Sequence, residues 1–519
     1  MSDFANEPVL ELRRASERAR CSEALAELEP RLPLRVPVAV GGDRRAGESL
    51  LSVDPSAPER TVALACGASA GDVDSAVTVA SAAQPAWGRR DVRARAALLR
   101  DVAAQLRGRH VELAALEVLE CAKPWPEASA DVAEAIDFCE YYARQAVAMA
   151  DGPALAQPPG EHNRLIQRPR GVCAVIAPWN FPIAIATGMT AAALVSGNAV
   201  CLKPAEQSPG CALAILEAFL AAGLDPRLLA LLPGEGEVGA GLVRHPDVAT
   251  VAFTGSAAVG LEIMAATATP RPGQRGLTRV VAELGGKNCM LVDADADLDD
   301  VIPAALASAF GFAGQKCSAT SRLLVHARVA AAVTERLCGA LDGQRVGPAR
   351  EFTTDVPAVI EAAARDRIEA TVAAAGSSAE VVRVADLPAA DGFWVAPTLV
   401  LDPPAGAEVR EEEIFGPVLS VEPVADMAEA CERVAAQRQA LTGSVFSRNP
   451  ATIAAVAAVT PVGNLYVNRG STGAMVGRQP FGGNRQSGTG AKAGGPGYLS
   501  HFCDPVVICE DTTRHGIPA

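Results

Sequence analysis

The sequence predicts an α/β protein in which parallel sheets form more than one domain. Between residues 172 and 266, short apolar strands alternate with helices, and the connections between them are short. This alternation is typical of a parallel sheet that is covered by helices on both faces. The chain of 519 residues is too long for a single core, and its apolar content of 49% is enough for sizeable cores.

The first 150 residues are predicted to be mainly helical after an N-terminal arm. A strand is expected at 36–40, and Pro37 would restrict it to a sheet edge because proline has no amide hydrogen. Asp72 is expected to cap a helix, and the apolar spacing across 96–106 predicts a second helix. Two prolines interrupt this pattern, and a third helix is expected from about residue 128 to residue 142.

The alternating region defines the first sheet. Its strands are expected at 172–176, 199–202, 229–232 and 248–253, and its helices at 182–194, at 209–222, up to residue 244, and at 259–266. Ligands of such sheets bind at the carboxyl ends of the strands. The loops that follow these strands are therefore the first place to look for a site.

A second α/β unit is expected after Glu283 and extends to about residue 481. Its expected helices lie around 298–310 and 327–341, and its expected strands at 321–325, 397–401 and 419–421. Residues 384–395 are predicted to be a surface loop. A glycine-rich tail at 482–497 leads to a last strand at 506–508.

Charge and composition exclude several classes of function. The net charge of −14 argues against a nucleic-acid-binding surface. Thirteen cysteines without paired spacing, and six histidines without ligand spacing, predict reduced thiols and no metal site. The N-terminus lacks a basic region followed by an apolar run, so we expect no signal peptide and a cytoplasmic protein. Residues 171–202 carry no charge, but their prolines and asparagines predict a buried α/β core rather than a membrane helix.

Cys317 is the leading candidate for a nucleophile. It lies in a loop of small residues after the apolar helical run at 301–310. Glu283, 34 residues upstream, could activate water to hydrolyse a thioester on that sulfur. Asn180 lies between aromatic residues in the uncharged stretch, and its amide could donate to a developing oxyanion. Each residue also has an ordinary explanation: a core thiol, a strand-end carboxylate and a turn asparagine.

Two strand ends could hold a nucleotide. Gly255 and Ser256 end one strand and open a helix, whose free N–H groups could bind a pyrophosphate. The same turn could be a simple helix cap. Lys203 and Glu206 could hold a ribose diol, or they could form a surface ion pair.

Seven motifs, taken together and in order, resemble those of the aldehyde dehydrogenase superfamily over nearly the whole chain. They are Trp-Asn-Phe-Pro at 179–182, Lys-Pro-Ala-Glu at 203–206, Phe-Thr-Gly-Ser at 253–256, Glu-Leu-Gly-Gly-Lys at 283–287, Gly-Gln-Lys-Cys at 314–317, Glu-Glu-Ile-Phe-Gly-Pro at 412–417 and Pro-Phe-Gly-Gly at 480–483. The resemblance implies an aldehyde dehydrogenase-like α/β fold, with a Rossmann-type cofactor domain, an α/β catalytic domain and a small oligomerisation arm.

The resemblance also implies a role for each candidate. Cys317 would be the nucleophile and Glu283 the general base, and Asn180 would form the oxyanion hole together with the Cys317 N–H group. The residues placed at an NAD cofactor are Trp179, Lys203, Glu206, Gly255, Ser256, Gly260, Glu413 and Phe415. The Glu206 carboxylate would favour NAD over NADP, because it repels a 2′-phosphate.

A finer resemblance, to the 1-pyrroline-5-carboxylate dehydrogenases of this superfamily, is carried by 468–483, 487–496, 123–127, 134–138 and 141–145. It implies oxidation of L-glutamate γ-semialdehyde. The residues expected at this substrate are Ser318, Gly473, Ala474, Phe181, Phe481 and Glu134. The consecutive N–H groups at 473–474 would bind the α-carboxylate, as an anion nest does. Two alternatives stay open: the same chemistry on another semialdehyde or aliphatic aldehyde, and a non-catalytic relative that binds the cofactor.

Domain boundaries and partners follow from the same resemblance. Residues 1–147 and 170–283 would form the NAD-binding domain, 284–482 the catalytic domain, and 148–169 and 483–519 the oligomerisation arm and tail. The arm and tail would exchange between subunits in a homodimer or an assembly of dimers. The only other expected partner is the small-molecule substrate, with no nucleic acid and no membrane. The chain departs from the family pattern at Ala122, where the family usually has glycine, and it matches poorly at 343–360.

Overall fold

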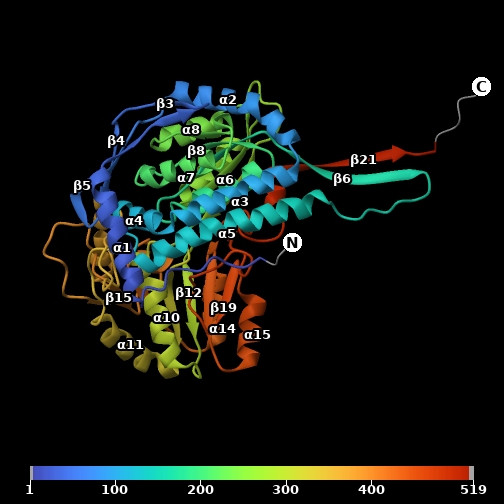
Figure 1. Ribbon diagram of the computed structural model, residues 1–519. Coiled ribbons are helices and arrows are strands. Elements are labelled where there is room, and N and C mark those ends of the chain that lie inside the picture. Colours follow the sequence, from blue (N-terminus) through green and yellow to red (C-terminus); the bar gives the residue numbers. More distant parts are fainter. Residues whose placement is uncertain (1–3, 514–519) are drawn as a thin grey trace, which may run out of the picture.

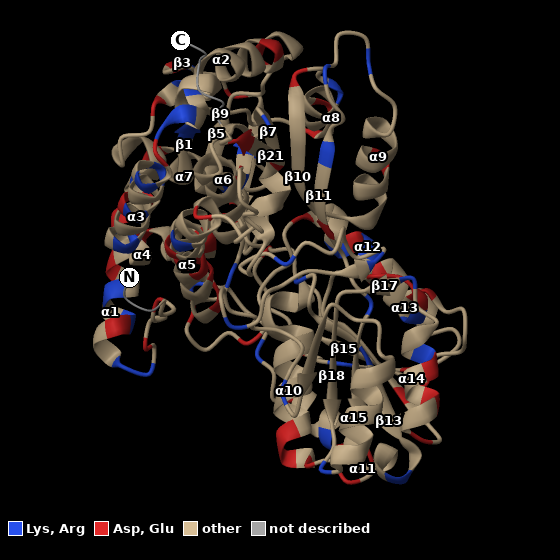
Figure 2. Ribbon diagram, turned by 90° about the vertical axis from the view of Figure 1, so that its right-hand side faces the viewer, with Lys and Arg blue, Asp and Glu red and all other residues tan. Residues whose placement is uncertain are grey.

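Residues 4–513, which the computed structural model describes, form two large sheet-based units and a projecting two-stranded arm (Figures 1 and 2). The first sheet has seven strands, in the spatial order β11 (Arg279–Leu284), β10 (Val248–Gly255), β7 (Val172–Ile176), β8 (Ala199–Lys203), β9 (Leu229–Leu231), β2 (Val38–Val40) and β3 (Asp43–Arg45). The five strands from β11 to β9 are parallel, as the alternating pattern predicts. Their apolar runs are buried on both faces of the sheet.

Helices cover this sheet in two layers. The helices that contact it directly are α2 (Ala70–Arg89), α6 (Ala184–Val195), α7 (Pro209–Ala221), α8 (Gly236–Arg244) and α9 (Ala257–Thr267). The helices α3 (Val92–Gly108), α4 (His110–Glu120) and α5 (Trp125–Ala150) pack on α6 and α7, and α1 (Ala15–Leu28) packs on α4. A three-stranded sheet of β1 (Leu34–Val36), β5 (Ala57–Ala65) and β4 (Leu50–Asp54) borders α4 and α7.

Three predictions in this half need correction. The expected strand at 36–40 is two strands in different sheets, because Pro37 cannot donate to a ladder and the chain changes sheets there. Its second part, β2, is not at an edge but lies between β9 and β3. Helix α2 is capped by Ser69, and Asp72 completes a capping box from the third helical position. Helix α5 begins at Trp125 rather than near residue 128, because a proline is tolerated in the first helical turn.

The second unit is also an α/β sheet, as expected. Its strands, in spatial order, are β14 (Glu380–Arg383), β15 (Thr398–Leu401), β16 (Val418–Val424), β13 (Thr320–His326), β12 (Asn288–Val292), β18 (Thr442–Phe446) and β19 (Asn464–Val467). Its helices are α10 (Leu298–Phe310), α11 (Ala327–Leu341), α12 (Ala362–Ala375), α13 (Glu408–Glu411), α14 (Met427–Ala435) and α15 (Pro450–Val459). The predicted loop at 384–395 has no helix or strand, although Trp394 and Val395 within it are buried.

The two sheets present opposite strand ends to each other. The parallel strands β7, β8, β10 and β11 share one carboxyl edge, and the candidate residues from 179 to 283 follow those ends. In the second sheet, β12 and β13 start just after residues 283–287 and after Cys317. The site therefore lies where the carboxyl edge of the first sheet meets the amino ends of these two strands.

The arm consists of β6 (Glu161–Pro169) and β21 (Cys503–Asp511), which pair antiparallel over their whole length. Figure 1 shows this pair extending away from the body of the molecule. The predicted strand at 506–508 lies inside β21. The last part of the predicted tail, residues 514–519, lies outside the described residues. In the part of the chain that is described, no helix is long and apolar enough to cross a membrane.

Candidate active site

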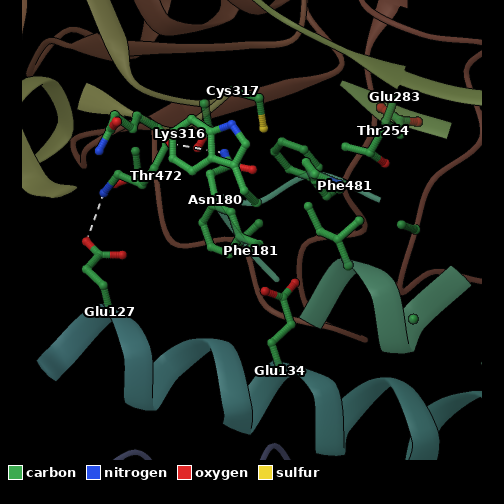
Figure 3. Close-up of a pocket in the computed structure, with 18 of the residues that line it drawn as sticks. Glu127, Glu134, Asn180, Phe181, Thr254, Glu283, Lys316, Cys317, Thr472 and Phe481 are labelled. Atoms are coloured by element: carbon green, nitrogen blue, oxygen red, sulfur yellow. Dashed lines mark hydrogen bonds and ion pairs between the residues drawn. The ribbon is translucent and has the colours of Figure 1, made fainter. Parts of the chain in front are cut away.

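A cavity of about 1050 Å³ lies between the two sheets and brings most of the candidate residues together (Figure 3). Its walls include the candidate residues Glu134, Trp179, Asn180, Phe181, Gly255, Ser256, Glu283, Cys317, Ser318, Glu413, Phe415, Gly473, Ala474 and Phe481. Lys203, Glu206 and Gly260 do not line this cavity. The first two form an ion pair of 3.1 Å beyond β8, and Gly260 lies in the second turn of α9.

The Cys317 loop is held by an unusual backbone. After α10 the chain turns through Phe312 and Ala313 at φ of 54° and 53°, then Gly314 at 68°. A Cβ atom on Gly314 would lie 2.3 Å from the carbonyl oxygen of Gly416, so only glycine fits there. The Asn288 side chain donates to the Cys317 carbonyl at 2.7 Å. These contacts fix the thiol at the start of β13.

The cavity disfavours the thiolate form of Cys317 when neither substrate nor cofactor is bound. Burial raises the pKa of the Cys317 thiol to about 12, and the nearby carboxyl groups of Glu413, Glu283 and Glu134 raise it further. Activation of the thiol therefore needs a change in the charges or dipoles around it when ligands bind.

Asn180 is buried, and both its backbone carbonyl and its side-chain amide form hydrogen bonds. Its carbonyl accepts from the Lys123 ammonium at 2.8 Å, and its side-chain amide donates to the Gln315 carbonyl at 2.9 Å. An asparagine amide has two hydrogens. The second hydrogen can serve an oxygen of a ligand in the cavity next to Cys317.

Glu283 lies at the carboxyl end of β11, and only one of its two carboxyl oxygens is hydrogen-bonded. Its Oε2 accepts from the Gly483 N–H group at 2.8 Å, whereas its buried Oε1 has no hydrogen-bond partner. Burial raises the pKa of this carboxyl group well above its ordinary value. A buried carboxylate with a raised pKa and a free oxygen is suited to take a proton from water.

Glu413 and two aromatic residues line the cavity toward the nucleotide side. The Gly286 N–H group donates to Glu413 at 3.1 Å, and a Cβ atom on Gly285 would lie 1.8 Å from its Oε2. Burial raises the pKa of Glu413 to about 7. Trp179 meets Phe415 edge to face with 5.7 Å between the ring centroids. A ribose hydroxyl could hydrogen-bond to Glu413 beside this aromatic wall.

The turn at Gly255 and Ser256, predicted to bind a nucleotide, has the features of a phosphate site. Ser256 caps α9 by accepting from Val259 N–H at 3.4 Å, and no acidic residue occupies the first turn. A Cβ atom on Gly260 would lie 2.4 Å from Leu284, so helix and strand approach closely there. The free N–H groups of the first turn and the positive end of the helix favour an anion.

Sequence reasoning assigned no role to two lysines of the site. Lys316 lines the cavity and pairs with Glu127 of α5 at 2.9 Å, as Figure 3 shows. Lys123 is fully buried behind Asn180, 3.4 Å from Asp131 and 3.5 Å from Glu117. Lys316 directly precedes Cys317 in the sequence, and this position could have predicted that it lines the cavity. Lys123 gave none beyond its presence in a quoted motif, because its partners are distant in sequence.

The end of the cavity that is predicted to hold the substrate is formed by α5 and a loop near the C-terminus. Figure 3 shows Glu134 rising from α5 toward Phe181 and Phe481. Burial raises the pKa of Glu134 to about 8, and the charge of Asp131 adds to this. Gly473 has a φ of +81°, and together with Ala474 it lines the same end. Ser471 joins this loop to the catalytic loop by donating to the Ser318 carbonyl at 2.8 Å.

Comparison with known proteins gives consistent results. The sequence pattern of the aldehyde dehydrogenase family matches residues 43–508. The chain is 40% identical to the 1-pyrroline-5-carboxylate dehydrogenase of Geobacillus sp. (strain WCH70) over 498 residues, 96% of this chain and 97% of the relative. The Thermus 1-pyrroline-5-carboxylate dehydrogenase with bound NAD is 39% identical, with a TM-score of 0.96 over 98% of this chain and 99% of that chain. The chain also matches 54% of proline utilization A from Bdellovibrio bacteriovorus, at 40% identity and a TM-score of 0.97.

Proposed function

Because the chain belongs to the aldehyde dehydrogenase family, we propose that it oxidises L-glutamate γ-semialdehyde to L-glutamate in proline catabolism, with NAD as the electron acceptor. The semialdehyde forms by hydrolysis of 1-pyrroline-5-carboxylate. One observation carries the proposal: a single cavity holds Cys317, Asn180 and Glu283 together with Glu134 and the 473–474 turn. The first set suits an aldehyde, and the second suits an amino acid.

In this function Cys317 is the nucleophile. Its sulfur attacks the aldehyde carbon, and Asn180 and the Cys317 N–H group donate to the resulting oxyanion. NAD, when bound, supplies the acceptor for the hydride, which leaves a thioester on Cys317. Glu283 then takes a proton from the water that hydrolyses this thioester.

The far end of the cavity binds the amino-acid part of the substrate. The α-carboxylate accepts hydrogen bonds from the N–H groups of Gly473 and Ala474 and from the hydroxyl group of Ser318. Glu134 in its ionised form pairs with the α-ammonium. Phe181 and Phe481 enclose the methylene groups between the two ends.

Most of the residues that hold NAD follow the carboxyl ends of strands in the first sheet, and Glu413 and Phe415 come from the second unit. Gly255, Ser256 and Gly260 surround the phosphates at the start of α9. Lys203 and Glu206, which pair with each other in this structure, bind the adenosine ribose when NAD is present. The Glu206 carboxylate disfavours a 2′-phosphate. Trp179, Glu413 and Phe415 border the nicotinamide ribose and ring. This placement is supported by the Gly286 bond that orients the Glu413 carboxyl group and by the edge-to-face contact of Trp179 with Phe415.

The proposal includes assembly and location. The β6–β21 arm exchanges between subunits of a homodimer or of an assembly of dimers, which is supported by its projection and by the 67% exposure of Val507. With this arm and the tail after residue 482 set apart, residues 1–147 and 170–283 form the NAD-binding domain and 284–482 the catalytic domain. A reducing compartment such as the cytoplasm agrees with thirteen free thiols, since oxidising compartments favour disulfides.

The test is NADH formation with 1-pyrroline-5-carboxylate, succinic semialdehyde or propanal as substrate. A preference for the first substrate that Cys317→Ala abolishes is expected. Cys338→Ala is the matched control, because Cys338 is similarly accessible but lies on α11 away from the cavity. A preference for another aldehyde would refute the substrate assignment and leave the chemistry standing. Turnover in Cys317→Ala, or no turnover of any aldehyde by the unmodified chain, would refute the chemistry.

A further inference from the structure

The start of the described chain lies along helix α5, beside the substrate end of the cavity. We call residues 4–10 the N-terminal strap. Phe4 packs edge to face on Tyr141 with centroids 5.3 Å apart, and the Leu10 N–H group donates to the Ser129 hydroxyl at 2.9 Å. The strap therefore runs antiparallel to α5, and Figure 1 shows this dark-blue segment beside the helix. Glu7 and Val9 of the strap line the cavity itself.

Asn6 joins this strap to the loop that carries the 473–474 turn. Its side-chain nitrogen donates to Asp137 of α5 at 2.8 Å and to the Val476 carbonyl at 2.8 Å. The neighbouring Glu7 N–H group donates to the other Asp137 oxygen at 2.7 Å. One amide group thus connects the helix that presents Glu134 with the loop that presents Gly473 and Ala474. Asn6 and Val476 are 470 positions apart in the sequence.

The loop is held by separate hydrogen bonds rather than by a strand ladder, and its own turn bonds involve Met475. Residues 471–477, the anchor loop, contain no helix or strand, so no ladder of backbone hydrogen bonds fixes them. Gly473 and Gly477 both have positive φ, and Arg469, which donates to the Thr472 and Gly473 carbonyls, is exposed. Ser471 holds one end of the loop, and the Gly477 N–H group holds the other by donating to the Gly494 carbonyl. The Val476 carbonyl and the Gly477 N–H group belong to one peptide unit, so the Asn6 bond ties this end of the anchor loop to α5 while the Gly477 bond ties it to Gly494.

We infer that Asn6 is a positioning residue for substrate specificity: it sets the distance between the anchor loop and α5, and with it the fit of the α-carboxylate and α-ammonium of an amino-acid semialdehyde. The inference rests on the proposed function. Asparagine suits this place because one amide nitrogen offers two hydrogens to two acceptors, a carboxylate and a carbonyl. Aspartate would place a third acceptor between them, and alanine would leave the Val476 carbonyl and one oxygen of Asp137 without this donor.

The experiment measures steady-state kinetics with L-glutamate γ-semialdehyde and with propanal, which has no α-carboxylate or α-ammonium. Asn6→Ala is expected to raise KM for the semialdehyde about fivefold to tenfold, the factor typical of one lost hydrogen bond, and much less for propanal. The kcat for the semialdehyde should stay within about twofold, because Cys317 and Asn180 are untouched. The matched control is Asn449→Ala, which removes the cap of α15 through its bond to Ala451 at 3.0 Å, away from the cavity.

The outcomes separate this inference from the proposed function. If the unmodified chain does not prefer the semialdehyde, the proposed function fails whatever the variants do. If it does, and Asn6→Ala keeps the original KM or weakens both substrates equally, the inference is wrong. Deuterium uptake of residues 470–478 gives an independent readout without turnover: Asn6→Ala should exchange faster there than Asn449→Ala, and equal exchange overturns the inference. Asn6→Ser, which keeps one donor, provides a milder variant with an intermediate expected effect should Asn6→Ala fold poorly.

Discussion

The buried ammonium of Lys123 gives the sharpest test of how the site is held. Glu117 and Asp131 lie within 3.5 Å of it, and all three side chains are fully buried. Burial and the charge of Asp131 raise the pKa of Glu117 well above its ordinary value. Burial alone would lower the pKa of Lys123, but Asp131 and Glu117 outweigh it and raise that pKa. The ammonium group of Lys123 therefore stays charged between the two buried carboxyl groups.

Lys123→Met is expected to lower the free energy of unfolding by about 3–5 kcal/mol, the usual cost of removing one partner from a buried ion pair. The structure accounts for this magnitude. The charged hydrogen bond to the Asn180 carbonyl contributes roughly 1.5–3 kcal/mol. The ammonium also lies 3.8 Å from the centre of the Phe181 ring, a contact worth about 2 kcal/mol when desolvated. Asp131 would keep only its bonds from the Ile183 and Ala184 N–H groups.

Urea denaturation followed by circular dichroism measures this loss. The double variant Lys123→Met/Asp131→Asn is the control, because it also removes the carboxylate of Asp131, which the single variant leaves buried without its cation. It should be more stable than the single variant. A loss below about 1 kcal/mol in the single variant, which is less than one charged hydrogen bond, would refute the reasoning. So would a double variant no more stable than the single one, since the cost would then come from packing.

Three further predictions concern carboxyl groups. Glu283→Gln should release one NADH per chain in a burst and then turn over about 10²–10⁴-fold more slowly; stopped-flow absorbance without a burst would contradict a role limited to water. The pKa of Glu134 is about 8, so its ionised form grows as pH rises; the ratio of KM in Glu134→Gln to that of the unmodified enzyme should rise about tenfold from about pH 7 to pH 9, and a constant ratio would exclude pairing with the α-ammonium. Glu422 is buried and accepts from Arg322 at 2.7 and 2.6 Å, so Glu422→Gln should lose about 3–5 kcal/mol of stability in urea titrations. Glu48→Gln, whose exposed carboxyl group pairs with the exposed Arg35, should lose less than about 0.5 kcal/mol, and an equal effect would contradict the argument.

The alternation of strands and helices from 172 to 266 could be predicted from the sequence because each local pattern agrees with its final surroundings. The sequence patterns did not predict the strands at 279–284, 288–292, 380–383, 442–446 and 464–467. The four strands from 172 to 253 are apolar except for Thr250, and nearly all of their residues are buried. Errors occurred at prolines. Pro37 marks a change of sheet and Pro126 lies inside a helix, and neither outcome follows from the residue alone, because proline is tolerated in both positions.

Ala122 shows how a departure from a family pattern acquires a physical meaning. The sequence comparison only noted alanine in place of the usual glycine. The structure shows φ of +50° at this residue, a left-handed conformation that favours glycine, in the turn between α4 and α5. The side chain is fully buried, so its methyl group gains packing that offsets part of the conformational cost.

The sequence by itself determined the chemistry of this protein. The thiol, the amide, the carboxylate and the glycines of the turns lie in short motifs, and the order of seven such motifs along the chain, rather than any one residue, predicts their roles. Only the tertiary structure decided what holds those groups in place. Lys123 reaches Asn180 across 57 positions, and Asn6 reaches Val476 across 470. Such contacts leave no local pattern, because they depend on how the two sheets and the N-terminal strap come together around the cavity.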